Sequence, residues 1–133
     1  MTDEAAVRVL IVDDQAPFRN AARTVVGLTP GFEVVGEAES GEEAVEMAAS
    51  LEPDLVLMDI NLPGINGIEA VRQIKAARNG TTAFLLSTYA VGDLPSGARS
   101  CGAVAYINKE DFEPGILMNL WAAGGDPAWP SDN

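Results

Sequence analysis

Short apolar runs alternate along the chain with longer segments in which apolar residues recur every three or four positions. The short runs are rich in Val, Ile, Leu and Ala and are bounded by polar residues, glycine or proline, which is typical of β-strands. They cover residues 7–12, 33–38, 54–59, 83–87 and 104–108. The segments between them have the spacing of amphipathic helices. This alternation predicts an α/β fold with one parallel sheet and helices on both faces.

The second run differs from the others because it carries Glu33 and Glu37, which favour a position at the edge of a sheet. The runs at 7–12 and 54–59 are apolar on both faces and therefore fit central strands. Together these features predict a doubly wound, five-stranded parallel sheet of the flavodoxin-like type, with strand order 2-1-3-4-5.

Local signals mark the ends of the predicted helices. Pro17 suits the first turn of a helix, because its missing N–H costs nothing there. The apolar stripe of this first helix is predicted to comprise Phe18, Ala21, Ala22, Val25 and Leu28. Ser40 with Glu43, and Asn66 with Glu69, have the spacing of N-terminal capping pairs.

The region between the fourth and fifth strands is a poor helix former. It contains Pro95, Ser96, Gly97 and Ser100. We therefore expect a short, mobile helix there. A last helix is predicted over 114–123, and residues 124–133 are predicted to form a flexible tail. Residues 1–123 would then be the single folded domain.

Four charged residues lie where the predicted strands end. Asp13 and Asp14 follow the first strand, Asp59 closes the third, and Lys109 follows the fifth. Ligands of open α/β sheets bind beyond the carboxyl ends of the strands, so these side chains are expected to share one pocket. Crowded carboxylates repel one another unless a cation lies among them, and oxygen ligands with room for water favour Mg²⁺. The lysine would then pair with an anion that arrives with the metal, for which phosphate is the obvious candidate.

Composition and charge exclude several functions. The net charge is −12, with 8 basic against 20 acidic residues, which argues against direct binding to nucleic acid or to an anionic membrane. Histidine is absent, so a phosphoryl acceptor in this chain must be a carboxylate or a hydroxyl. The single Cys101 cannot form an internal disulfide, and no secretory signal is recognisable at the start. These features predict a cytoplasmic location.

Over residues 7–121 the pattern resembles the receiver domain of two-component response regulators. Asp13-Asp14 resembles the family's acidic metal-binding pair, and Asp59 in Leu-Met-Asp-Ile-Asn-Leu-Pro-Gly resembles its phosphoacceptor segment. Ser87 resembles the hydroxyl residue that ends the fourth strand, and Tyr106 resembles the aromatic switch residue. Lys109 resembles the family's lysine. Glu110 stands where many relatives have proline, a variation associated with receivers joined to helix-turn-helix output domains.

The resemblance implies a phosphorylation-dependent signalling module rather than an enzyme acting on a separate substrate. Asp59 would accept a phosphoryl group, with Mg²⁺ held by Asp13, Asp14, Asp59 itself and the main-chain carbonyl of Asn61. Lys109 and Ser87 would contact the phosphoryl oxygens. The resemblance also implies a switch in which Ser87 and Tyr106 move together and alter the face built from the fourth helix, the fifth strand and the last helix.

The implied partners are a sensor histidine kinase or phosphotransfer protein and, through the switch face, a second copy or a downstream protein. Asn61 and Tyr89 would flank the site and adjust how fast the phosphoryl group is lost. The chain as given contains no helix-turn-helix segment, so we expect either a receiver that acts alone through protein contacts or a piece of a longer regulator.

Other interpretations stay open at this point. Asp13 alone could cap the first helix, Lys109 alone could be a solvated loop residue, and Thr88 competes with Ser87 for the phosphate. The domain could be a receiver-like interaction module that never accepts phosphate. A flavodoxin-like cofactor binder would share the topology, but such proteins hold phosphate in a hydroxyl- and glycine-rich loop after the first strand, where the paired acids would repel it.

Overall fold

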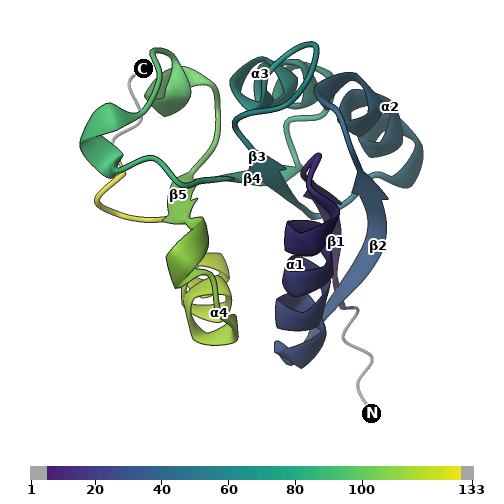
Figure 1. Cartoon of the computed structure of the whole chain (residues 1–133). Helices are drawn as coiled ribbons and strands as arrows, with labels where there is room; N and C mark the ends of the chain where they lie inside the picture. The colour runs from purple at the N-terminus through teal and green to yellow at the C-terminus, as the bar shows by residue number, and fades with distance from the viewer. Residues whose placement is uncertain (1–5, 130–133) are drawn as a thin grey trace.

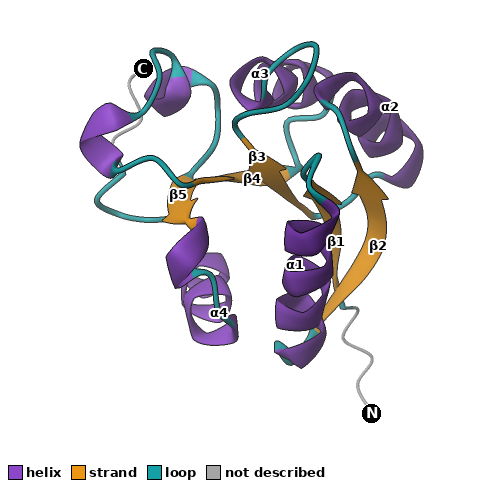
Figure 2. Cartoon of the chain, viewed as in Figure 1, coloured by secondary structure: helices purple, strands orange, loops and turns teal. Residues whose placement is uncertain are grey.

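A computed structural model describes residues 6–129, which form a five-stranded parallel sheet with strand order β2-β1-β3-β4-β5 (Figure 2). The predicted order and the predicted edge position of the second strand are both confirmed. The strands are β1 (Val7–Val12), β2 (Phe32–Ala38), β3 (Leu55–Asp59), β4 (Thr82–Ser87) and β5 (Ala105–Asn108).

Four α-helices cover the two faces of this sheet. They are α1 (Ala16–Leu28), α2 (Gly41–Leu51), α3 (Gly67–Ala77) and α4 (Pro114–Ala123). Figure 1 shows α1 and α4 on one side of the sheet and α2 and α3 on the other. Right-handed crossovers place successive helices on opposite sides where the strand order reverses.

Each face of the sheet has its own apolar core. Successive side chains of β1 and β3 point to opposite faces of the sheet. Leu10 and Met58 therefore pack beneath α2 and α3, whereas Ile11 and Leu57 pack beneath α1 and α4. Every residue of β3 is buried. A strand covered on both faces needs a continuous apolar sequence, which explains why this run shows no polar alternation.

The predicted helix caps are present. The Ser40 side chain accepts a hydrogen bond from the N–H of Glu43 at 3.1 Å, and Asn66 accepts one from the N–H of Glu69 at 2.9 Å. Both caps satisfy main-chain donors that the first turn leaves unpaired. They also fix the entry of α2 and α3 from loops beside the strand ends.

The apolar stripe predicted for α1 is partly wrong. Ala22 and Val26 are the buried residues of this helix, and Leu28 is 67% exposed. Thr29 ends the helix in extended conformation and is itself buried, 2% exposed, so the polar residue after Leu28 lies inside while Leu28 faces solvent. The helical spacing correctly predicts α1, but which of its residues are buried depends on how the helix is rotated on the sheet.

No α-helix connects β4 to β5 in the described chain, so the prediction of a short helix there is wrong. Two 3₁₀ turns, η1 (Val91–Asp93) and η2 (Ala98–Ser100), take its place. Gly97 adopts a φ of +89° immediately before η2, a conformation that interrupts helical geometry. A third 3₁₀ turn, η3 (Lys109–Asp111), follows β5.

The chain continues past α4 and crosses the β5 edge of the sheet. Figure 1 shows this segment in yellow, running from the α4 side to the side of η1 and η2. Trp129 lies at its end and is 8% exposed. The division into a domain at 1–123 and a flexible tail stays a prediction; residues 124–129 make packing contacts, and residues 130–133 lie outside the described part. Between residues 6 and 129, no helix has the length and apolar character needed to cross a membrane.

Candidate functional site

The carboxyl ends of β1 and β3 bring three carboxylates together. Val12 pairs with Met58 in the parallel register, so the residues that follow them, Asp13 and Asp59, emerge side by side. Asp14 joins them, and carboxylate oxygens of the three residues all lie within 4.8 Å of one another. Asp13 and Asp59 are buried, whereas Asp14 is exposed.

Lys109 reaches this cluster from the end of β5. Its Nζ lies 2.7 Å from Oδ2 of Asp13 and 3.3 Å from Oδ1 of Asp59. The Phe18 ring supports the ammonium group, with Nζ 4.6 Å from the ring centroid. The Asn108 side chain caps η3 by accepting from the N–H of Glu110 at 2.9 Å, which fixes the turn that presents the lysine.

A polar pocket of about 250 Å³ opens above the cluster. Its lining residues come from four strand ends and are Asp14, Gln15, Asp59, Asn61, Ser87, Thr88 and Lys109. Asp13 lies beneath this surface, where its Oδ1 accepts from the N–H of Gln15 at 2.8 Å. The geometry therefore gives Asp13 a supporting position and leaves Asp14 and Asp59 facing the pocket.

The electrostatics of the pocket favour an incoming cation. Burial, and after it the charge of Asp13, raises the pKa of the Asp59 carboxyl from 3.8 to about 6, although Lys109 acts in the opposite direction. One lysine therefore does not compensate the carboxylates fully. For Lys109, burial alone would lower the pKa, but its bond to Asp13 and the nearby negative charges outweigh burial and raise it. Lys109 stays a cation, and a further positive charge would stabilise the ionised site.

The donor set fits a hard divalent metal ion. The three carboxylates supply oxygen ligands, Lys109 is a cation and therefore no metal ligand, and the pocket leaves space for water. Mg²⁺ keeps several waters and binds through one or two carboxylates, which suits this arrangement better than the many protein ligands that Ca²⁺ takes. Asn61, the second residue after β3, also lines the pocket.

Ser87 and Tyr106 are linked through the main chain at the end of β4. The Tyr106 hydroxyl lies within hydrogen-bonding distance of two carbonyl oxygens, that of Tyr89 at 2.6 Å and that of Ser87 at 3.0 Å, which share its one hydrogen. Burial raises the pKa of Tyr106, so its hydroxyl keeps its proton and stays a donor. Ser87 is 1% exposed, whereas Thr88 is exposed. Tyr89 also reaches the pocket, because its hydroxyl lies 3.2 Å from Oδ1 of Asn61.

Two residues that support this site are not predicted from the sequence to do so. A side chain at Gly67 would collide with the main-chain oxygen of Asp59, so α3 packs against the strand end only because this residue is glycine. The sequence pattern places Phe18 in the apolar stripe of α1 and does not predict its contact with Lys109. The position of Gly67 beside the capping residue Asn66 does not indicate that Asp59 will pack against it. The position of Phe18 in the first helical turn after two acids is a weak signal that it lies near the acidic site.

Comparison with known proteins gives consistent matches. Residues 9–120 match the family model of the response regulator receiver domain. The transcriptional regulatory protein DegU of Brevibacillus brevis is 34% identical over 92% of this chain and 53% of its own length. The nitrate/nitrite response regulator protein NarL of Escherichia coli K12 is 33% identical over 95% of this chain and 59% of its own.

A solved structure agrees with these relatives. The two-component response regulator of the LuxR family from Aurantimonas sp. SI85-9A1 superimposes with a TM-score of 0.82 and 29% identity, covering 95% of this chain and 91% of that one. The chain spans between half and three fifths of the length of the two relatives named above.

Proposed function

The chain belongs to the receiver domains of two-component response regulators, and from this membership we propose that Asp59 accepts a phosphoryl group in a site that holds Mg²⁺. The observation that carries the proposal is the convergence of Asp13, Asp14 and Asp59 within 4.8 Å, with Lys109 beside them. Asp14, Asp59 and the main-chain carbonyl of Asn61 would hold the ion, and Asp13, which lies beneath them, would contribute partly through water.

The transfer itself is a substitution at phosphorus. A carboxylate oxygen of Asp59 forms the new bond to phosphorus, and the bond from phosphorus to the donor's leaving group breaks and keeps its electron pair on that group. When bound, Mg²⁺ would neutralise charge on the phosphoryl oxygens. These 133 residues contain no histidine, so a phosphohistidine donor would lie outside them, and we propose a sensor histidine kinase or a phosphotransfer protein as the donor.

Lys109 and Ser87 would receive the phosphoryl group once it is attached. Lys109 already lies 3.3 Å from Oδ1 of Asp59, so its ammonium can pair with a phosphoryl oxygen without a large movement. The Ser87 hydroxyl lines the same pocket and would donate a hydrogen bond to another oxygen. Apart from promoting gain and loss of its own phosphoryl group, the domain would catalyse no reaction.

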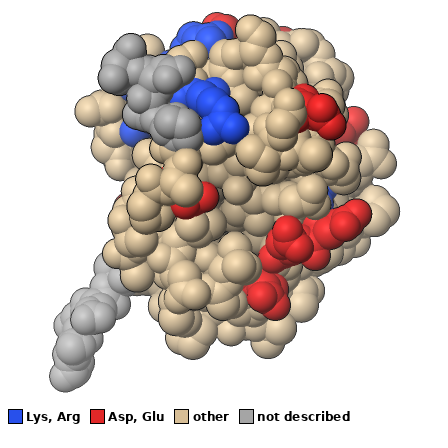
Figure 3. Space-filling model, turned by 90° about the vertical axis from the view of Figure 1, so that its left-hand side faces the viewer, with Lys and Arg blue, Asp and Glu red and all other residues tan. Residues whose placement is uncertain are grey.

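Output would follow from the face built by η1 and η2, β5 and α4, with Ser87 and Tyr106 as the switch residues. Figure 3 shows the side of the molecule that carries β5: uncharged residues cover much of it, and acidic side chains gather along one flank. Val91 in η1 and Met118 in α4 are exposed apolar side chains. Such a surface suits a second copy or a downstream protein better than nucleic acid, and a cytoplasmic location would give access to the kinase.

Intact-mass measurement after exposure to acetyl phosphate tests the proposal. Wild type should gain the mass of one phosphoryl group with Mg²⁺ and gain none with a chelator. Asp59→Asn should gain none, whereas Asp93→Asn, which removes an exposed acid in η1, should behave as wild type. Labelling that persists in Asp59→Asn would refute the assignment.

A further inference from the structure

The segment after α4 is held against β5 by specific main-chain contacts. Gly125 has a φ of +130°, and its N–H donates to the carbonyl of Leu120 at 2.9 Å. The N–H of Asp126 then donates to the carbonyl of Val104 at 2.9 Å. A side chain at Gly125 would approach that same Val104 carbonyl to 2.6 Å, so only glycine allows this close passage across the sheet edge.

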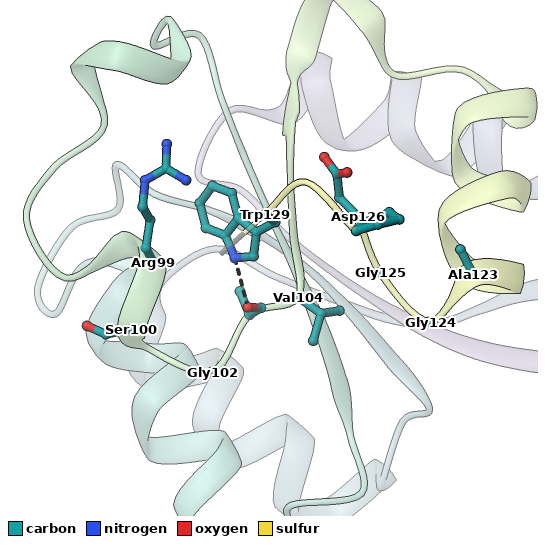
Figure 4. A pocket seen from close by; sticks show the side chains of 11 residues that line it. Arg99, Ser100, Gly102, Val104, Ala123, Gly124, Gly125, Asp126 and Trp129 are labelled. Carbon is teal, nitrogen blue, oxygen red and sulfur yellow. Dashed lines mark hydrogen bonds between the residues drawn. The ribbon is translucent and has the colours of Figure 1, made fainter. Parts of the chain in front are cut away.

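Trp129 anchors the end of this segment on the opposite side of the sheet from α4. Its indole N–H donates to the carbonyl of Ala103 at 3.0 Å, and the Arg99 guanidinium lies 4.7 Å from the ring centroid (Figure 4). On another side the indole stacks with Tyr106, with centroids 6.4 Å apart and planes inclined by 28°. Asp126 supports the turn, because its side chain accepts from the N–H of Ala128 at 2.9 Å.

Tyr106 connects this anchor to the pocket that contains Asp59. Its ring touches Trp129, and its hydroxyl holds the carbonyls of Ser87 and Tyr89. Ser87 lines the pocket directly, and Tyr89 reaches it through Asn61. A continuous set of contacts therefore runs from Trp129, the last residue that the structure describes, to the pocket that contains Asp59.

We propose that the segment Gly124–Trp129 is an intramolecular ligand of the Tyr106 surface, and that docking of Trp129 and loading of Asp59 strengthen each other. The proposal rests on the proposed function, since it concerns the same site. It also identifies what occupies this part of the output face: the chain's own indole, which a partner must displace or build upon.

Docking of Trp129 and binding at Asp59 should favour each other, because both order the end of β4. Ser87 and Thr88 line the pocket with Asp59, so a ligand at Asp59 would contact and order the end of β4. Docked Trp129 fixes Tyr106, whose hydroxyl holds the carbonyl groups of Ser87 and Tyr89, the residues on either side of Thr88 at the same strand end. When two events share one ordering cost, each makes the other more favourable, and linkage requires the effect to be equal in both directions.

Beryllofluoride with Mg²⁺, a non-transferable mimic of the phosphoryl group, provides the probe. In Trp121→Phe the fluorescence comes from Trp129 alone, since the chain has two tryptophans and Trp121 packs on Phe32 on the other face. Adding the mimic should lower the acrylamide quenching of Trp129. Trp129→Ala should bind the mimic about fivefold more weakly than wild type. Trp129→Phe should bind with intermediate strength, because it keeps an aromatic ring and loses the bond to Ala103.

A double-mutant cycle separates coupling from general loosening of the fold. Tyr106→Phe keeps the ring that stacks on Trp129 but lacks the hydroxyl that holds the end of β4. In that background, Trp129→Ala should change binding of the mimic less than twofold. An equal effect in both backgrounds, or unchanged quenching of Trp129 in protein that does bind the mimic, would overturn the coupling and leave the proposed function standing. Wild type that binds no mimic would overturn both.

Discussion

Replacing Asp59 by asparagine should stabilise the metal-free protein near neutral pH. The native carboxyl has its pKa raised from 3.8 to about 6 by burial and by the charge of Asp13. Folding therefore opposes its ionisation. Ionised Asp59 therefore lowers the free energy of unfolding. This loss is absent below about pH 4, where the carboxyl is protonated in the folded and the unfolded protein, and it grows with pH until it is complete above about pH 6.

The size of the effect follows from the two pKa values. At about 1.36 kcal/mol per pH unit, the difference between 3.8 and about 6 corresponds to an upper limit of about 3 kcal/mol. Because the pocket is open to water, which screens these charges, about 1–2 kcal/mol is the realistic gain for Asp59→Asn. With a urea dependence of about 1–3 kcal/mol per molar, the unfolding midpoint should rise by about 0.5–1 M.

Urea denaturation with chelator present measures this gain. The difference between Asp59→Asn and wild type should be full near pH 7.5 and close to zero near pH 4. Asp93→Asn, which removes an exposed acid of η1, should show no such pH dependence. Equal or lower stability of Asp59→Asn near pH 7.5 would mean that the carboxylate cluster is not strained without metal, and the electrostatic argument would fail.

Further predictions concern the neighbours of this carboxylate. Lys109→Met leaves the buried Asp13 and Asp59 without their cation, so the free energy of unfolding, measured by urea denaturation with chelator, should fall by about 2–3 kcal/mol. Mg²⁺ should restore part of this loss. Wild-type stability of the variant in chelator would contradict the pairing of Lys109 with the two acids. Gly67→Ala should cost about 1–3 kcal/mol in thermal denaturation, because the new methyl meets the main chain of Asp59, whereas Gly92→Ala, which has open space around it, should cost far less. Mg²⁺ affinity in calorimetric titration should fall as the pH falls through about 6, since protons compete for Asp59, and an affinity that does not change with pH would refute that competition.

The sequence by itself determined the strands, their order and the grouping of charged side chains at the strand ends. Five apolar runs gave the strands, and charge placed the second at the edge, because burial on both faces excludes Glu33 and Glu37 from a central strand. The N-terminal caps of α2 and α3 are also predictable from the sequence, since each depends on two residues three positions apart. Acids and a lysine that follow strands of a parallel sheet must meet, so the cluster of Asp13, Asp59 and Lys109 followed from topology alone.

Only the tertiary structure decided features that depend on distant neighbours. Val26 rather than Leu28 is buried, because the rotation of α1 on the sheet is set by packing and not by spacing. Gly67 is confined by the main chain of Asp59, which is near it only once α3 is docked. Trp129 resembled part of a loose tail in the sequence. It is buried because the chain crosses the β5 edge and finds Tyr106 and the Ala103 carbonyl there, and no local pattern encodes a contact between elements that meet only after folding.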